Sequence, residues 1–159
     1  MRTSFMDNLD KHIITFLQEN GRMRYTKIAE KLGVTEGTVR NRAARLREEN
    51  LIQIVGMTEP HSMGYEAPAV IGISVQPAQL ETAAETIATF PEVNYLILVS
   101  GEYDLIVEVF CRNREHLAAF VTDKLQPIDG IQKTQTFMIL HTYKMAHGAK
   151  PIYEPSTPE

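Results

Sequence analysis

The chain has 159 residues, with 16 lysine and arginine side chains against 20 aspartate and glutamate side chains and a net charge of -4 at pH 7. A share of 43% apolar residues is ordinary for a globular protein and excludes disorder throughout. No stretch approaches the roughly 20 apolar residues of a membrane helix, and the N-terminus lacks the layout of a signal peptide. With a single cysteine and no internal disulfide, these features predict a cytoplasmic protein without membrane contact.

The charge is distributed unevenly along the chain. Residues 1–56 hold ten basic and seven acidic side chains, a net charge of +3, whereas the remainder holds six basic and thirteen acidic ones, a net charge of -7. Such asymmetry predicts two domains with different partners. We expect one domain over residues 1–56, a linker over 57–66, a second domain over 67–146 and a tail over 147–159.

Apolar periodicity predicts three helices in the first domain. The first carries apolar residues at helical spacing from Leu9 to Leu17, and we expect a left-handed Gly21 to end it. The second runs through Ile28 and Leu32 and stops at Gly33. The third begins at a capping Thr35, turns Val39, Ala43 and Leu46 inward and closes at Asn50, and a strand is expected over Leu51–Val55.

The third helix leaves hydrogen-bond donors on its outer side. A short helix, a turn at Gly33 and a following helix with exposed donors form the arrangement that enters a DNA major groove. Arginine contacts guanine edges or phosphates, and asparagine pairs with adenine. The predicted DNA-binding residues are Thr35, Thr38, Arg40, Asn41, Arg42 and Arg45. The alternative interpretation is that the arginines form only a solvated helix face.

The second domain has the pattern strand, helix, strand, strand, helix, strand. The strands are expected at Ala69–Val75, Tyr95–Val99, Leu105–Phe110 and about Ile131–Tyr143, with helices after Pro77 and Asn113. This order predicts a ferredoxin-like βαββαβ sandwich, so the whole chain is assigned to the α+β class. One face of its sheet is left uncovered although Val70, Ile106, Phe110, Phe137 and Ile139 on it are apolar, which predicts a homodimer formed through the sheets.

Specific residues in both domains resemble the Lrp/AsnC (feast/famine) family of transcription regulators. The segment from Leu9 to Ile52 is similar to its winged helix-turn-helix, through Gly33-Val34-Thr35, Thr38-Val39, Arg42, Leu46 and Leu51-Ile52 in this order. In the second domain, the turn from Ser100 to Asp104 matches the family's S-G-x-x-D turn. Two positions depart from the family: Arg24 replaces a small polar cap, and Gly37 replaces a side chain that often contacts DNA.

The resemblance implies a small effector, often an amino acid, bound where dimers meet in a higher oligomer. The residues implied are Ser100, Gly101, Tyr103 and Asp104 of the turn with Thr134 and Thr136 of the last strand. Glycine lets a ligand approach the backbone, a carboxylate pairs an α-ammonium group and hydroxyls form hydrogen bonds. The alternative is that Gly101 and Asp104 only shape a hairpin turn.

No catalytic motif and no metal constellation occurs in the sequence, so we expect no enzyme, no cofactor and no metal site. The sequence therefore predicts a sequence-specific regulator of transcription that binds double-stranded DNA and responds to a metabolite. Two alternatives stay open: a nucleoid-organising protein of low specificity, and a small-molecule sensor or enzyme whose N-terminal helices are only an oligomerisation arm. The proline-containing tail from Gly148 is expected to be extended or disordered, with Ile152 and Tyr153 as anchors.

Overall fold

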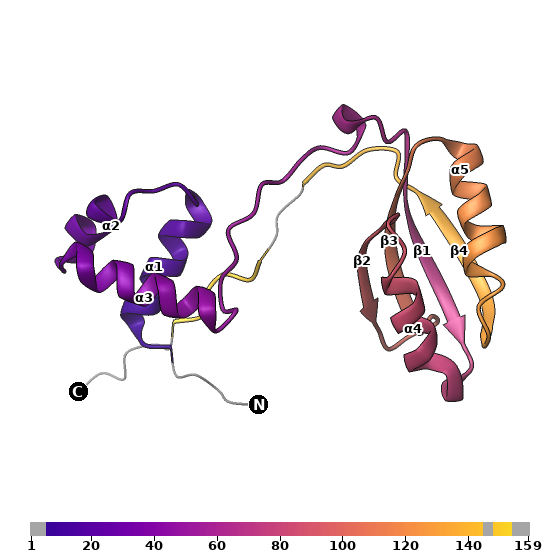
Figure 1. Cartoon of the computed structure of the whole chain (residues 1–159), viewed down its shortest axis with the longest axis horizontal. Helices are drawn as coiled ribbons and strands as arrows, with labels where there is room; N and C mark the ends of the chain where they lie inside the picture. The colour runs from indigo at the N-terminus through magenta and orange to yellow at the C-terminus, as the bar shows by residue number, and fades with distance from the viewer. Residues whose placement is uncertain (1–5, 145–147, 154–159) are drawn as a thin grey trace. The chain divides into compact units, whose positions relative to one another are not determined.

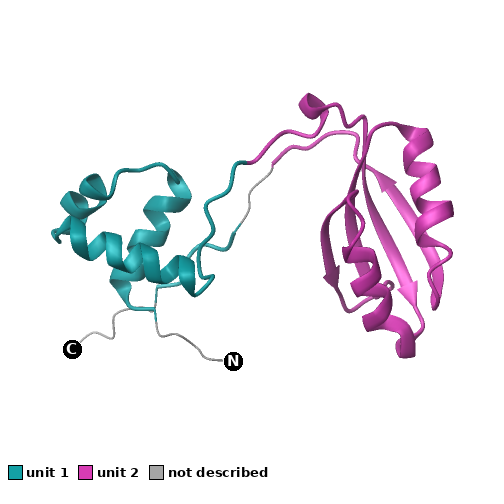
Figure 2. Cartoon of the chain, in the orientation of Figure 1, with its two compact units in different colours: residues 1–56, 145–159 teal, residues 57–144 magenta. Residues whose placement is uncertain are grey.

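The computed structural model describes residues 6–144 and 148–153 (Figure 1). The chain divides into two compact units, one of residues 1–56 with 145–159 and one of residues 57–144 (Figure 2). In the part of the chain that is described, no helix has the length and apolar character needed to cross a membrane.

The first unit contains the three expected helices: α1 (Asn8–Glu19), α2 (Tyr25–Leu32) and α3 (Glu36–Glu48). Their inward faces meet in one apolar core, in which Ile13 of α1, Ile28 of α2 and Leu46 of α3 are fully buried. Because each helix is short, its stability comes mainly from this shared burial. The third helix is thereby fixed with one face inward and the other toward solvent.

Side chains at the helix ends account for where the helices start and stop. Asp7 and Asp10 form a reciprocal capping box at the start of α1. The expectation that a left-handed Gly21 ends α1 is wrong. Asn20 ends it in an extended conformation, and its side chain accepts a hydrogen bond from the Arg22 N–H at 2.9 Å, so the turn needs no left-handed residue.

Asn50 closes α3 as predicted, but the strand predicted after it is absent from residues 51–55. Asn50 has φ 55°, and the Leu51 N–H bonds back to the Leu46 carbonyl, which satisfies the last turn of the helix. The strand expected over Leu51–Val55 is not formed, because within residues 6–144 and 148–153 these residues pair with no strand. A β-prone sequence becomes a strand only where a partner supplies the ladder of hydrogen bonds.

The second unit is a four-stranded antiparallel sheet with helices on one face. Its strands are β1 (Ala67–Val75), β2 (Val93–Leu98), β3 (Leu105–Cys111) and β4 (Ile131–Met138), in the order β2-β3-β1-β4. The helices are α4 (Leu80–Ala88) and α5 (Arg114–Ala119), the latter continued by a π-helical segment, Phe120–Leu125. Short 3-10 turns occupy His61–Met63 and Pro77–Gln79. This confirms the βαββαβ sandwich and the α+β class.

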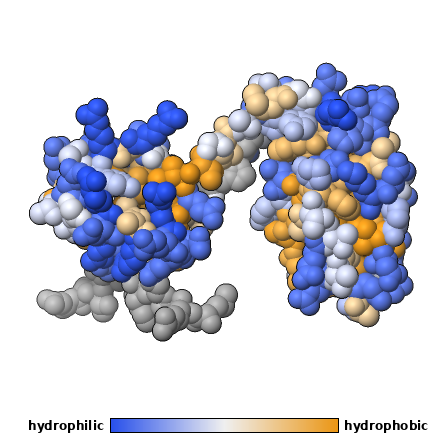
Figure 3. Space-filling model, in the orientation of Figure 1, coloured by the Kyte–Doolittle hydropathy of each residue, from blue (hydrophilic) through white to orange (hydrophobic). Residues whose placement is uncertain are grey.

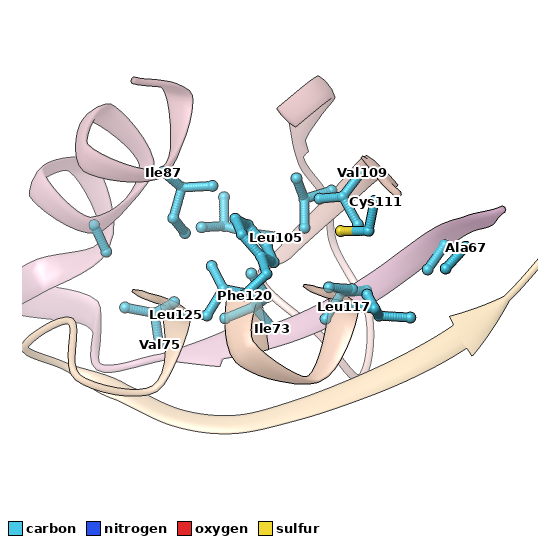
Figure 4. Close-up of a cluster of buried hydrophobic side chains, with 14 residues drawn as sticks. Ala67, Ile73, Val75, Ile87, Leu105, Val109, Cys111, Leu117, Phe120 and Leu125 are labelled. Carbon is cyan, nitrogen blue, oxygen red and sulfur yellow. The ribbon is translucent and has the colours of Figure 1, made fainter. Parts of the chain in front are cut away.

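Alternation along the strands separates a covered face from an open one. Ile73 of β1 lies in one buried cluster with Ile87 of α4 and Phe120 (Figure 4). Ile71 of β1 and Val107 of β3 belong to the same cluster. The opposite set of side chains includes Val70, which pairs with Phe137, and Ile106, which pairs with Gly72. Phe137 is 48% exposed. The last strand is shorter than predicted, since β4 ends at Met138 and not at Tyr143.

The described part of the tail lies in the first unit. Tyr153 contacts α1 through its hydroxyl and its ring. Ile152 is 84% exposed, so the expectation that it anchors the tail is wrong.

Candidate DNA-binding surface and effector-binding turn

The N-terminal end of α3 is organised by two threonines. The Thr35 hydroxyl accepts a hydrogen bond from the Thr38 N–H at 3.2 Å, and the two hydroxyl oxygens lie 2.9 Å apart. Thr35 is thus the helix cap that the sequence predicts. Gly37 between them is exposed, so the backbone of the first turn is accessible to a phosphate.

The outer face of α3 carries four residues that are exposed to solvent: Arg40, Asn41, Ala44 and Arg47. Residues three, four and seven positions apart share one side of a helix. Arg40 forms an ion pair with Glu36 one turn earlier, and the Arg40 side chain is 65% exposed. Arg47 was not among the residues selected from the sequence, although its spacing from Arg40 and Ala44 places it on the same stripe. Figure 3 shows hydrophilic residues over much of the visible face of this unit.

Arg42 and Arg45 point to a different neighbour. Arg42 Nη1 lies 2.5 Å from a carboxylate oxygen of Asp7 and 3.1 Å from one of Asp10. Arg45 Nη2 lies 2.5 Å from the other oxygen of Asp10, whose side chain is 1% exposed. Hydrogen bonding to Asp7 raises the pKa of Arg42. Two of the three predicted arginines are therefore held against α1 in an ion-pair network within the unit.

This network divides the predicted DNA-binding residues into two groups. Arg40 and Asn41 face solvent, whereas Arg42 and Arg45 are partly covered and already paired. A buried carboxylate with two arginines fixes the crossing of α1 and α3, because each partner would otherwise be left uncompensated. Sequence reasoning could not separate the groups, since Asp10 lies 35 positions from Arg45.

The turn from Ser100 to Asp104 joins β2 to β3 on the open side of the sheet. Asp104 accepts a hydrogen bond from the Val75 N–H through Oδ2 at 2.8 Å, and its own N–H bonds to the Ile73 carbonyl at 3.0 Å. These bonds tie the turn to β1 and give Asp104 a structural role. Ser100 and Gly101 are exposed, and a side chain added at Gly101 would meet no atom within 4 Å. The space above Gly101 is therefore open.

Tyr103 lies across the open face of the sheet. A Cβ added to Gly72 would fall 2.7 Å from its ring, so only glycine at this position accommodates the ring. The phenol donates a hydrogen bond to Gln135, and Lys133 Nζ lies 5.3 Å from the ring centroid and 3.0 Å from Glu102. Gln135 and Lys133 were missed in the sequence, where nothing in their spacing marks them.

Thr134 and Thr136 lie on the other face. Thr134 pairs with Ile73 and Thr136 with Ile71, and both isoleucines belong to the core under the helices. Directly opposed residues of an antiparallel pair share a face, so within one chain the two threonines do not join Tyr103. The β4 residues that contact Tyr103 are Lys133 and Gln135, which alternate with the two threonines along the strand.

Comparisons with known proteins match both units. Residues 6–47 match the AsnC-type helix-turn-helix domain, and residues 68–148 match the Lrp/AsnC ligand binding domain. The chain belongs to the Lrp/AsnC family. This confirms the resemblance carried by the turn at Gly33 and by the Ser100–Asp104 motif.

Relatives of this Lrp/AsnC protein cover nearly its full length. An HTH-type transcriptional regulator of Pyrococcus horikoshii is 35% identical over 143 residues, which are 89% of this chain and 90% of the relative. The structure of Escherichia coli AsnC superimposes with a TM-score of 0.81 at 29% identity, over 92% of this chain and 99% of that one. A Neisseria meningitidis transcriptional regulator solved as a complex with L-Met gives a TM-score of 0.79 at 25% identity, over 89% and 94% of the two chains.

The Lrp/AsnC protein is thus a transcriptional regulator with a helix-turn-helix DNA-binding domain and a ligand-binding domain. The relatives that match over nearly the full chain are HTH-type transcriptional regulators.

Proposed function

We propose that this Lrp/AsnC regulator binds specific DNA sequences through the outer face of α3 and that a small metabolite of the amino-acid class changes its DNA affinity or its assembly. The observation that carries the proposal is the division of the arginines. Arg42 and Arg45 hold α3 against α1, while Arg40, Asn41 and Arg47 remain on the solvent side. A recognition helix needs both a fixed orientation and donors that are exposed to solvent.

The expected roles on DNA follow from exposure and chemistry. Asn41 is suited to a bidentate pair with adenine, and Arg40 and Arg47 are suited to guanine edges or phosphates. Thr35, Thr38 and the exposed backbone at Gly37 lie at the helix N-terminus, where phosphate binding is favoured. Arg42 and Arg45 reach a phosphate only by sharing or leaving their carboxylate partners.

The effector proposal rests on the open turn. Ser100 is exposed and the space at Gly101 is open. In the same turn, the Tyr103 ring contacts Lys133, which forms an ion pair with Glu102. Opposite charges next to an aromatic surface suit a ligand with both a carboxylate and an ammonium group. The L-Met complex of the Neisseria neighbour is consistent with this class.

The open face of the sheet supports assembly. Its apolar side chains on β1, β3 and β4 are only partly buried within one chain: Val70, Ile106, Phe110 and Phe137. We propose that two copies cover these faces in a homodimer and that dimers associate further, so that Thr134 and Thr136 meet the turn of a neighbouring copy. A dimer presents two α3 helices to two half-sites and predicts a pseudo-palindromic operator.

DNA binding is tested by selecting duplexes from a random pool and titrating the selected sequence against a scrambled one at fixed salt. We expect at least about a thousandfold preference for the selected sequence. Asn41→Ala should lose about 1–3 kcal/mol of that preference, whereas Asn8→Ala at the exposed start of α1 should not change it. Equal binding of all sequences with a steep salt dependence would instead favour a nucleoid-organising role.

The effector is tested by thermal shift with individual amino acids at millimolar concentration. A ligand of the native state raises the midpoint in proportion to RT ln(1 + [L]/Kd). Absence of any shift with all twenty amino acids would contradict the proposed effector class while leaving the DNA result unaffected.

A further inference from the structure

One side of α1 is covered by the chain's own C-terminal tail. The side-chain nitrogen of Gln18 donates to the carbonyl oxygen of Ala149 over 2.9 Å. One turn earlier, the hydroxyl oxygens of Thr15 and Tyr153 are 3.1 Å apart. Two polar contacts from residues more than 130 positions away in the sequence thus meet one helix face.

The ring of Tyr153 adds a second kind of contact. Its centroid lies 5.1 Å from that of the His12 ring, at an interplanar angle of 49°, and 5.9 Å from Lys11 Nζ. Aromatic pairs and cations over aromatic rings attract at these separations. The helix face from Lys11 to Gln18 therefore offers an aromatic partner, a cation and two polar groups to the segment that holds Ala149 and Tyr153.

The direction of the tyrosine hydrogen bond follows from proton counting. The Thr15 hydroxyl donates its only proton to the Lys11 carbonyl at 2.9 Å. It can therefore only accept at its contact with Tyr153, and the phenol O–H is the donor. Removal of the phenol oxygen alone is predicted to weaken the contact while leaving the ring in place.

We propose that the α1 face formed by Lys11, His12, Thr15 and Gln18 is a docking site for the chain's own C-terminal tail, with Tyr153 as its anchor. The chain leaves the first unit after Gly56 and returns to it with the tail, so a docked tail gives the DNA-binding unit a second chain connection to the ligand-binding unit. Because the tail is covalently attached, individually weak contacts suffice to keep it docked.

Docking is tested by hydrogen-deuterium exchange of the full chain, a measurement that needs neither DNA nor effector. Tyr153→Ala should speed exchange of the α1 amides about fivefold, and Tyr153→Phe should give a smaller increase. Ile152→Ala is the matched control, because Ile152 is the neighbouring large apolar residue and is 84% exposed. Equal α1 exchange in Tyr153→Ala and Ile152→Ala would overturn the proposal.

A cross-link identifies whose tail occupies the site. Gln18→Cys combined with Ala149→Cys, in a Cys111→Ala background, places two thiols at the polar contact. Oxidation of the full chain should give a disulfide within one chain, which migrates as a monomer on a non-reducing gel. A product that migrates as a covalent dimer would assign the site to the tail of a second copy and overturn docking of the chain's own tail.

Discussion

Arg45 of the third helix donates a hydrogen bond to the buried carboxylate of Asp10 in the first helix, across 2.5 Å. The second oxygen of the same carboxylate accepts from Arg42 at 3.1 Å. An arginine that the sequence assigns to DNA is thus part of the framework that orients the recognition helix.

Replacement of Asp10 by alanine is predicted to destabilise the first unit strongly. Two guanidinium groups lose a partner and the capping box of α1 is broken, which should lower the free energy of unfolding by about 2–4 kcal/mol. Glu36→Ala removes the exposed partner of Arg40 and should change the free energy of unfolding by less than about 0.5 kcal/mol. Urea titrations of the two variants measure the difference, and equal midpoints would contradict a structural role for Asp10.

The first unit is predicted to lose part of its stability in acid through Asp7. The hydrogen bond from Arg42 holds the pKa of Asp7 below its ordinary value. A lowered folded-state pKa stabilises the protein above the unfolded-state pKa of about 3.9, and this contribution disappears as the pH falls through the lower value.

Asp7→Asn separates that effect from helix capping, because asparagine caps a helix as well as aspartate does. Thermal midpoints between pH 2.5 and pH 7 should show a smaller acid loss in the variant than in the natural protein. At pH 7 the free energies of unfolding of the variant and the natural protein should differ by less than about 1 kcal/mol, since the Asp7 side chain is 53% exposed. Parallel curves over the whole range would refute the assignment.

Gly72→Ala is predicted to displace Tyr103 from the open face of the sheet. The added Cβ would lie 2.7 Å from the ring, a separation that forces the ring or the strand to move. The tyrosine near-UV circular dichroism should change, and binding of any effector at the turn should weaken. Gly56→Ala serves as the control, because a Cβ there meets no atom within 4 Å. An unchanged spectrum would show that the turn tolerates the methyl group.

Cys111 is predicted to resist thiol reagents in the native protein. Burial among the core side chains raises the pKa of its thiol to about 11. The thiolate is the reactive form. A disulfide reagent at pH 8 should therefore react at least about 100-fold more slowly with the native chain than with the chain unfolded in urea. Comparable rates in the two states would mean that the covered face opens readily.

The sequence by itself determined the elements and their class. Helical spacing from Leu9 to Leu17, the cap at Thr35, the left-handed Gly33 and Asn50 and the alternation in Ala69–Val75 all report on local backbone preferences, which act between residues a few positions apart. The Ser100–Asp104 turn and the turn at Gly33 also indicated the Lrp/AsnC family.

Only the tertiary structure decided what the functional side chains contact. Helical spacing shows that Arg42 and Arg45 point away from their own helix core, but not that Asp10 meets them, because that contact depends on how α1 crosses α3. Thr134 and Thr136 lie on the face of the sheet away from Tyr103 because of the pairing register of β1 with β4. A shift of that register by one residue would exchange the two faces of β4. The strand expected over Leu51–Val55 is not formed because it has no partner strand among the described residues. Local preferences fix segments, whereas packing between segments distant in sequence selects which side chains remain free to bind.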